Sequence, residues 1–197
     1  NSDGTYMLDV IPTFKICDEV AFTAQVFDGD KLIAEKSINV CPGKVDKITF
    51  GVLDVLEWSA EIPKLYSLIL KLEKDGELCE IIRRNIGFKH IKINKNVFYF
   101  NNKKIKLLGV NHHDTNPKTG YAMTIEDMEK DVITFKEYNV NCVRTSHYPP
   151  DPAFIDLCDE YGVYVVDEAD IECHGVCEIH KLSLIHISEP TRLRCIS

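Results

Sequence analysis

Hydrophobic and polar positions alternate in short runs along the first half of the chain, and turn signals interrupt the runs. The segments 7–11, 20–27 and 67–72 are each five to eight residues long, and their apolar residues lack helical spacing. Asp-Gly-Asp at 28–30 and Pro-Gly at 42–43 are typical of turns between strands. The pattern predicts an antiparallel β-sandwich of roughly 90 residues.

The periodicity changes after Asn94. Thr124 and Asp127 are spaced as a helix N-cap and its N3 acid, and apolar residues follow at helical spacing. The predicted elements are, in order, a strand over 104–110, a helix that begins after Thr124, a strand over 140–145, a helix that begins after Asp151 and ends at Gly162, and a strand over 163–167. Strands that alternate with helices predict an α/β fold with a parallel sheet.

Composition narrows the class of protein. The 197 residues are 45% hydrophobic and 27% charged, with eight prolines and ten glycines, which is ordinary for a globular chain and excludes disorder. Apolar runs such as 163–166 are far shorter than the ~20 residues of a membrane span. A net charge of −8 without a basic cluster argues against nucleic acid as a partner. We expect a soluble, cytoplasmic protein.

The eight cysteines are widely and irregularly spaced, and none forms Cys-x-x-Cys. Several lie in apolar segments, where a thiol behaves as a small hydrophobic group. The spacing favours reduced thiols, and a Cys17–Cys79 disulfide across the sandwich is the alternative.

Both ends of the sequence look cut. The chain begins at Asn1 without a signal region, and residues 182–192 have neither helical nor strand periodicity. That segment resembles the in-frame translation of a sequencing adapter, so we treat 182–197 as a non-native tail and exclude it from the functional argument.

Polar residues suited to catalysis cluster at the ends of the three strands of the second half. They are Asn111, His112, His113 and Asp114 at the first strand, Arg144, Thr145, Ser146, His147 and Tyr148 at the second, and 167–175 at the third. Because the carboxyl ends of parallel strands meet at one edge of a sheet, these residues are expected to share one site.

Each group also has a purely structural explanation. Residues 111–114 could form a solvated turn, and His147 could pack under the prolines that follow it. Arg144 could pair with Asp167 or Glu168 without touching a substrate.

Glu172 and His174 lie two residues apart, so in an extended segment both side chains point to the same side. A carboxylate with an imidazole suits a divalent cation, and it equally suits an ordinary charge-assisted hydrogen bond. Cys173 and Cys177 suggest zinc, but no second spaced pair completes four ligands.

The joint pattern resembles glycoside hydrolase family 2, with the β-galactosidases closest. Three motifs carry the resemblance, GVNHHD at 109–114, RTSHYP at 144–149 and YVVDEADIECHG at 164–175, and segments 56–66 and 85–89 add to it. The resemblance implies an immunoglobulin-like β-sandwich over 1–90, followed over 91–181 by the first three β/α units of a TIM barrel.

The same resemblance implies roles for individual residues. His113 and His147 match histidines that contact the sugar and stabilise the transition state, and Asn111 and Arg144 match residues that line the pocket. Glu172 and His174 match two ligands of a magnesium ion, with Na⁺ a further ion in the full-length parent. His112 stands where many relatives have Arg, and Cys173 where they usually have Thr or Ser.

The parent protein is therefore expected to be a retaining β-galactosidase that removes terminal non-reducing β-D-galactose, and to be homo-oligomeric. Retaining glycosidases use two carboxylates ~5 Å apart. In this family both come from later strands, one of them in an Asn-Glu pair, and no Asn-Glu occurs here. We expect the isolated chain to be inactive and prone to aggregate in its second half. Alternatives are a β-glucuronidase or β-mannosidase of the family, or a non-catalytic carbohydrate-binding protein.

Overall fold

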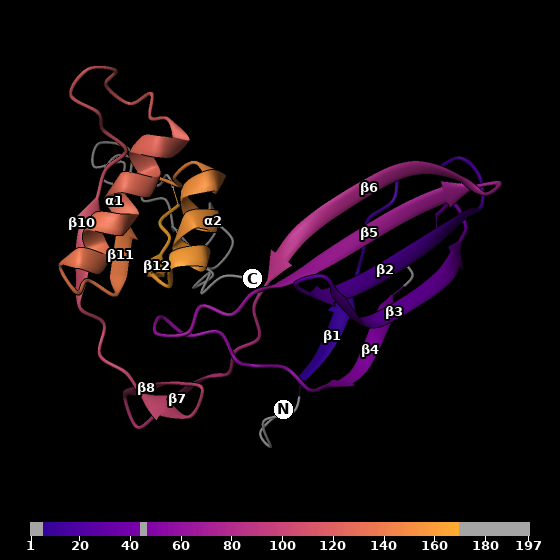
Figure 1. Ribbon diagram of the computed structural model, residues 1–197, viewed down its shortest axis with the longest axis horizontal. Helices are drawn as coiled ribbons and strands as arrows, with labels where there is room; N and C mark the ends of the chain where they lie inside the picture. The colour runs from indigo at the N-terminus through magenta and orange to yellow at the C-terminus, as the bar shows by residue number, and fades with distance from the viewer. Residues whose placement is uncertain (1–5, 44–46, 170–197) are drawn as a thin grey trace, which may run out of the picture. The chain divides into compact units, whose positions relative to one another are not determined.

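The computed structural model describes residues 6–43 and 47–169, which form twelve strands and two helices (Figure 1). These residues divide into two compact units. The first comprises 6–58 and 64–91, and the second comprises 59–63 and 92–169. Each unit has a hydrophobic core of its own.

The first unit contains two antiparallel sheets. The larger has the strand order β3-β2-β5-β6, and the smaller pairs β1 with β4. The bounds are β1 Tyr6–Val10, β2 Val20–Asp28, β3 Lys31–Val40, β4 Ile48–Leu53, β5 Tyr66–Lys74 and β6 Glu77–Ile86. Figure 1 shows the long neighbouring strands β2, β5 and β6 of the larger sheet.

Strand β2 shows why the two sheets pack together. Its alternate residues Val20, Phe22, Ala24 and Val26 are buried, because successive side chains in a strand point to opposite faces. Both sheets contribute to the same core, with Tyr6 and Phe50 coming from the smaller one. The predicted sandwich is thus observed.

The single tryptophan is buried in the segment between β4 and β5. Trp58 is only 1% exposed, and its backbone N–H donates to the Phe88 carbonyl at 2.8 Å. A Cβ at Gly87 would lie 3.1 Å from the Trp58 Cβ, so the indole packs directly on the glycine backbone. The segment between β4 and β5 is therefore an ordered loop.

The second unit begins with a small sheet that the sequence analysis did not anticipate. Its strands are β7 Ile91–Asn94, β8 Val97–Phe100 and β9 Lys103–Lys104, in the order β7-β8-β9. Each connection is two residues with positive φ, Lys95-Asn96 and Asn101-Asn102. Positive φ at both central residues is the geometry of the tight turns that join antiparallel strands.

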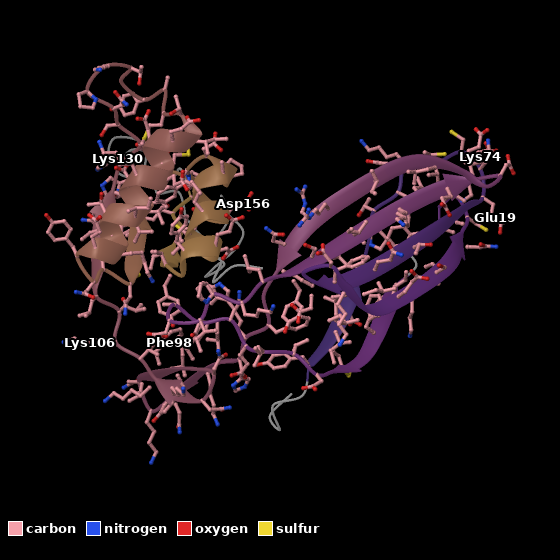
Figure 2. All side chains as sticks on the ribbon, viewed as in Figure 1. Glu19, Lys74, Phe98, Lys106, Lys130 and Asp156 are labelled. Carbon is pink, nitrogen blue, oxygen red and sulfur yellow. The ribbon has the colours of Figure 1, made fainter. Side chains whose placement is uncertain are left out.

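Three parallel strands follow, separated by two helices. β10 spans Gly109–His112, β11 Cys142–Thr145 and β12 Tyr164–Val166, with α1 over Ile125–Glu137 and α2 over Pro152–Tyr161. The core contains Val132 of α1, Phe154 of α2 and Val143 of β11, so the helices cover this sheet. Figure 2 shows the side chains, with Lys130 labelled on α1 and Asp156 on α2.

The caps of both helices are as predicted. The Thr124 hydroxyl accepts from the Asp127 N–H and the Asp127 carboxylate accepts from the Thr124 N–H, which completes a capping box. Asp151 caps α2 ahead of Pro152, and Gly162 ends it in the left-handed conformation.

The first parallel strand is shorter than predicted, and the prediction of a strand from 104 to 110 was wrong. Lys103 and Lys104 pair with β8, and the ladder with β11 starts only at Gly109. Between them the Asn141 side chain binds the backbone, accepting from the Leu108 N–H at 2.7 Å and donating to the Lys106 carbonyl at 3.0 Å. A side-chain amide thus replaces strand pairing, and Asn111 and His112 fall inside β10.

The five cysteines within the described residues are free, so the alternative Cys17–Cys79 disulfide is not formed. Neither of the helices in 6–43 and 47–169 is long and apolar enough to cross a membrane. The suspected tail at 182–197 lies outside the described residues.

Gly162 offers a test of the second unit's packing. Its φ is +76°, and an added Cβ would lie 2.5 Å from the Ala60 carbonyl oxygen. We expect Gly162→Ala to lower the free energy of unfolding by about 2–4 kcal/mol, since a left-handed alanine and a backbone clash add together. Urea unfolding followed by circular dichroism at 222 nm reports on α1 and α2.

The matched control is Gly120→Ala, because Gly120 has a similar φ of +67° but open space around it. That variant should lose only about 1 kcal/mol. Equal losses in the two variants would contradict the close approach at Gly162.

Candidate functional site

The parallel register brings three strand ends to one edge of the sheet. Asn111 of β10 lies beside Arg144 of β11, and Arg144 lies beside Val166 of β12. The chain continues past each strand into polar residues, among them His113, His147 and Glu168. Residues that are far apart in the sequence therefore share one edge.

The Arg144 guanidinium is the centre of this cluster. Its Nε donates to Glu168 Oε1 at 2.6 Å, Nη1 donates to Asn111 Oδ1 at 3.4 Å, and Nη2 lies 3.3 Å from His147 Nδ1. Arginine suits this position because its planar fork presents several donors in fixed directions. One side chain thus contacts residues from the ends of three different strands.

Glu168 holds Arg144 from one side and His147 from the other. Its Oε2 lies 3.1 Å from His147 Nδ1. A carboxylate favours a hydrogen on the nitrogen that faces it, which orients the imidazole. Hydrogen bonding from Arg144, and then from His147, lowers the pKa of Glu168 below its ordinary value despite partial burial. Glu168 is therefore an anion at neutral pH.

The backbone of Glu168 is fixed as well. The Thr145 hydroxyl accepts from the Glu168 N–H at 3.0 Å and donates to Asp167 Oδ1 at 3.3 Å. Thr145 is almost fully buried, so this contact ties the end of β11 to the residues after β12. Of the two carboxylates considered for Arg144, Glu168 is the partner.

His113 is the exposed histidine of this group. Its ring centroid lies 5.7 Å from that of His147 at an interplanar angle of 73°, and 6.1 Å from the Tyr148 ring. His113 and Asn111 are exposed, whereas Arg144 and His147 are partly buried. The edge therefore offers imidazole, amide and guanidinium groups, which can hydrogen-bond the hydroxyls of a polar ligand.

The structure thus brings together the four residues predicted for substrate contact, namely Asn111, His113, Arg144 and His147. Their roles stay predictions. Glu172 and His174, the predicted metal ligands, lie outside the described residues. Within the described part of the chain, no group of three His, Cys, Asp or Glu side chains is arranged to hold a metal ion.

Sequence reasoning included Glu168 in the shared site as part of 167–175 and named it as a possible partner of Arg144, but it gave Glu168 no specific role there. The available signal was its position directly after a buried strand, at the same edge as the histidines. The double contact to Arg144 and His147 depends on the register of β11 and β12, which a sequence pattern does not give.

Comparison with known families decides the classification. Residues 14–89 match the family described as Glycosyl hydrolases family 2, and residues 91–193 match its TIM barrel domain. The chain belongs to glycosyl hydrolase family 2. Its two units accordingly correspond to the immunoglobulin-like domain and to part of the family 2 barrel, as the resemblance implied.

Curated relatives of the family 2 chain include β-galactosidases. The enzyme of Streptococcus thermophilus is 46% identical over 148 residues, which cover 75% of this chain and 14% of the relative. The Photobacterium profundum enzyme is 39% identical over 171 residues, covering 81% and 16%. The chain therefore spans only about a sixth of the length of the relatives it matches.

Solved structures of the family agree with the fold. A family 2 member from Bacteroides cellulosilyticus superposes with a TM-score of 0.73 at 27% identity, covering 79% of this chain and 21% of that one. A β-glucuronidase from Parabacteroides merdae gives a TM-score of 0.70 at 25% identity, covering 78% and 20%. The family 2 fold is thus common to enzymes with different names.

Glu168→Gln tests the ion pair. Neutralising the carboxylate should lower the free energy of unfolding by about 1 kcal/mol at pH 7, because both side chains are partly exposed. The pKa of Glu168 is depressed in the folded state, so this contribution is complete above the ordinary glutamate pKa and is lost as pH falls through the lowered one. Urea midpoints between pH 7 and pH 3 measure it.

The control is Glu137→Gln, which removes an exposed carboxylate at the end of α1. The difference between wild type and Glu168→Gln should shrink at acid pH, and the control should show no such dependence. A Glu168→Gln deficit that stays constant down to pH 3 would argue against the ion pair.

Proposed function

We propose that this chain is part of a retaining β-galactosidase that hydrolyses terminal non-reducing β-D-galactosides. The observation that carries the proposal is the Arg144 cluster, which joins Asn111, His147 and Glu168 at the carboxyl edge of three parallel strands. Active sites of α/β barrels are built at that edge. Relatives named β-galactosidase, 35–46% identical over most of the chain, support galactose as the sugar.

Within this proposal, the residues of the chain bind and orient the sugar. Asn111, His113 and His147 supply hydrogen-bonding groups for its hydroxyls, and Arg144 with Glu168 holds His147 in place. Hydrogen bonds to the sugar hydroxyls that strengthen in the oxocarbenium-like transition state would lower its free energy. The two carboxylates that break the glycosidic bond would come from later barrel strands, so the chain by itself is inactive.

β-Glucuronidase is the second candidate, because solved β-glucuronidases share the fold. The Glu-x-His-Gly sequence at 172–175 favours β-galactosidase, since the glucuronidase branch shares the Ser-His-Tyr-Pro segment and lacks this one. The nitrophenyl glycosides of the two sugars distinguish the candidates directly.

We also propose Glu172 and His174 as two ligands of a Mg²⁺ ion. Carboxylate oxygen is a donor that magnesium prefers, and the ion would supply positive charge beside the catalytic acid. Two protein ligands alone would bind Mg²⁺ weakly.

The activity is tested in a hybrid enzyme, in which residues 6–175 replace the aligned segment of the Streptococcus thermophilus β-galactosidase. The hybrid should hydrolyse nitrophenyl β-D-galactoside and leave the β-D-glucuronide intact, while the 197-residue chain alone stays at the buffer background. His113→Ala and His147→Ala in the hybrid should each lower kcat about 10²-fold, because each removes a preorganised contact to the transition state.

Tyr121→Phe is the control, since Tyr121 is 78% exposed and outside the cluster. Its kcat should equal that of the unmodified hybrid. Cleavage of the glucuronide in preference to the galactoside would replace the proposed function with the second candidate, and turnover by the isolated chain would refute its inactivity.

Magnesium dependence is read from the same hybrid. Glu172→Gln should raise the Mg²⁺ concentration needed for half-maximal activity after chelation with EDTA, because one carboxylate ligand is lost. Glu160→Gln serves as the control at a carboxylate of α2. An unchanged Mg²⁺ requirement in Glu172→Gln would remove that residue from the proposed ligands.

A further inference from the structure

We propose that His112 is the positioning residue that fixes the two site histidines, His113 and His147, relative to each other. The inference rests on the proposed function, which gives His113 and His147 their roles at the sugar. His112 itself is not proposed to contact the sugar. Its basis is a set of contacts that links His112 to α1, to α2 and to the end of β11.

Strand alternation separates His112 from its neighbours. Asn111 and His113 are exposed, whereas His112 is only 9% exposed, because successive side chains of a strand point to opposite faces. The two site residues and the buried imidazole are therefore consecutive in one strand end. Because the three residues share one backbone, a shift of the His112 backbone would displace the residues on either side of it.

Two aromatic rings hold the imidazole in place. The Phe154 ring of α2 stacks on it with centroids 4.6 Å apart and an interplanar angle of 10°. The Phe135 ring of α1 meets it edge-on at 5.8 Å and 89°. Such packing leaves the His112 ring little freedom to rotate or shift.

Carboxylates face both ring nitrogens, and one of the two contacts is a hydrogen bond. Nε2 lies 3.0 Å from Asp131 Oδ2 of α1, and Nδ1 lies 3.5 Å from Asp114 Oδ1. Asp114 Oδ1 is buried and makes no hydrogen bond within the described residues, so the imidazole edge is the polar group that it faces. Buried polar atoms of this kind are costly to leave uncompensated, which favours keeping His112 between the two carboxylates.

The His112 backbone extends the same link to His147. Its carbonyl oxygen accepts from the Ser146 N–H at 3.1 Å and from the Ser146 hydroxyl at 3.3 Å. Ser146 is 1% exposed and directly precedes His147. In addition, the Asp114 N–H donates to the Tyr148 hydroxyl at 3.1 Å. The end of β10 and the residues that follow β11 are therefore joined at two points.

These contacts converge on one residue. The side chain of His112 is held by both helices, its peptide neighbour His113 enters the site, and its carbonyl holds the residue before His147. Small displacements of groups that stabilise a transition state cost rate even when substrate still binds. Loss of the His112 ring should therefore shift the positions of His113 and His147 while the fold is retained.

Hydrogen exchange in the 197-residue chain tests this directly. In His112→Ala, the amides of Asp114 and Ser146 should exchange at least about tenfold faster, while the α2 amides stay within about threefold of wild type. His112→Arg should restore protection, because a guanidinium can stack on Phe154 and pair with Asp131. The measurement uses mass spectrometry with residue-level fragmentation.

Val132→Ala is the matched control, since Val132 is fully buried in the core of this unit and its side chain has no hydrogen-bonding group. A general loss of stability should raise exchange in α2 and at Ser146 together. If His112→Ala behaves like Val132→Ala, or if His112→Arg fails to restore the two amides, the positioning role is wrong.

Kinetics of the hybrid enzyme supply the second readout. His112→Ala should lower kcat about tenfold or more with KM changed less than about threefold, and His112→Arg should recover kcat. An unchanged kcat in His112→Ala would overturn the proposal. If the unmodified hybrid is inactive on galactosides but the exchange pattern is as expected, the proposed function fails and the structural role of His112 stands.

Discussion

The candidate site depends on the parallel pairing of three short strands. β10, β11 and β12 contribute only a few residues each, yet their common direction places every strand end at one edge. Buried apolar residues such as Val143 and Val165 hold the strands against the two helices. Because the core fixes the register, it also fixes which polar residues meet beyond it.

Arg144 converts that register into a defined arrangement of polar groups. A half-exposed ion pair such as Arg144–Glu168 adds little to stability, since water already solvates both charges well. Its consequence is geometric, because Glu168 binds both Arg144 and His147, and the Arg144 guanidinium in turn donates to Asn111. On the buried side of the same strand end, contact with solvent is small. There His112 is held by stacking on Phe154 and by a hydrogen bond with the Asp131 carboxylate.

Several features could be read from the sequence because they depend on local chemistry. The capping box at Thr124, the Pro and Gly that bound α2, and the alternation in β2 each follow from the backbone preferences of a few neighbouring residues. The predicted strands also placed the four site residues at strand ends, and the family motifs implied their roles. The start of β10 was misjudged, since a distant side chain, Asn141, occupies the backbone that a strand would have paired.

The sequence alone thus determined the alternation of strands and helices in the second half, the two-part organisation of the fold and the residue types available at the sheet edge. Those properties depend on spacing along the chain. Tertiary structure decided which partners meet: Glu168 with Arg144 and His147, and His112 with Asp131 and Phe154. Such contacts join residues about 20 to 40 positions apart, and their distances follow from strand register and core packing, which no local pattern encodes.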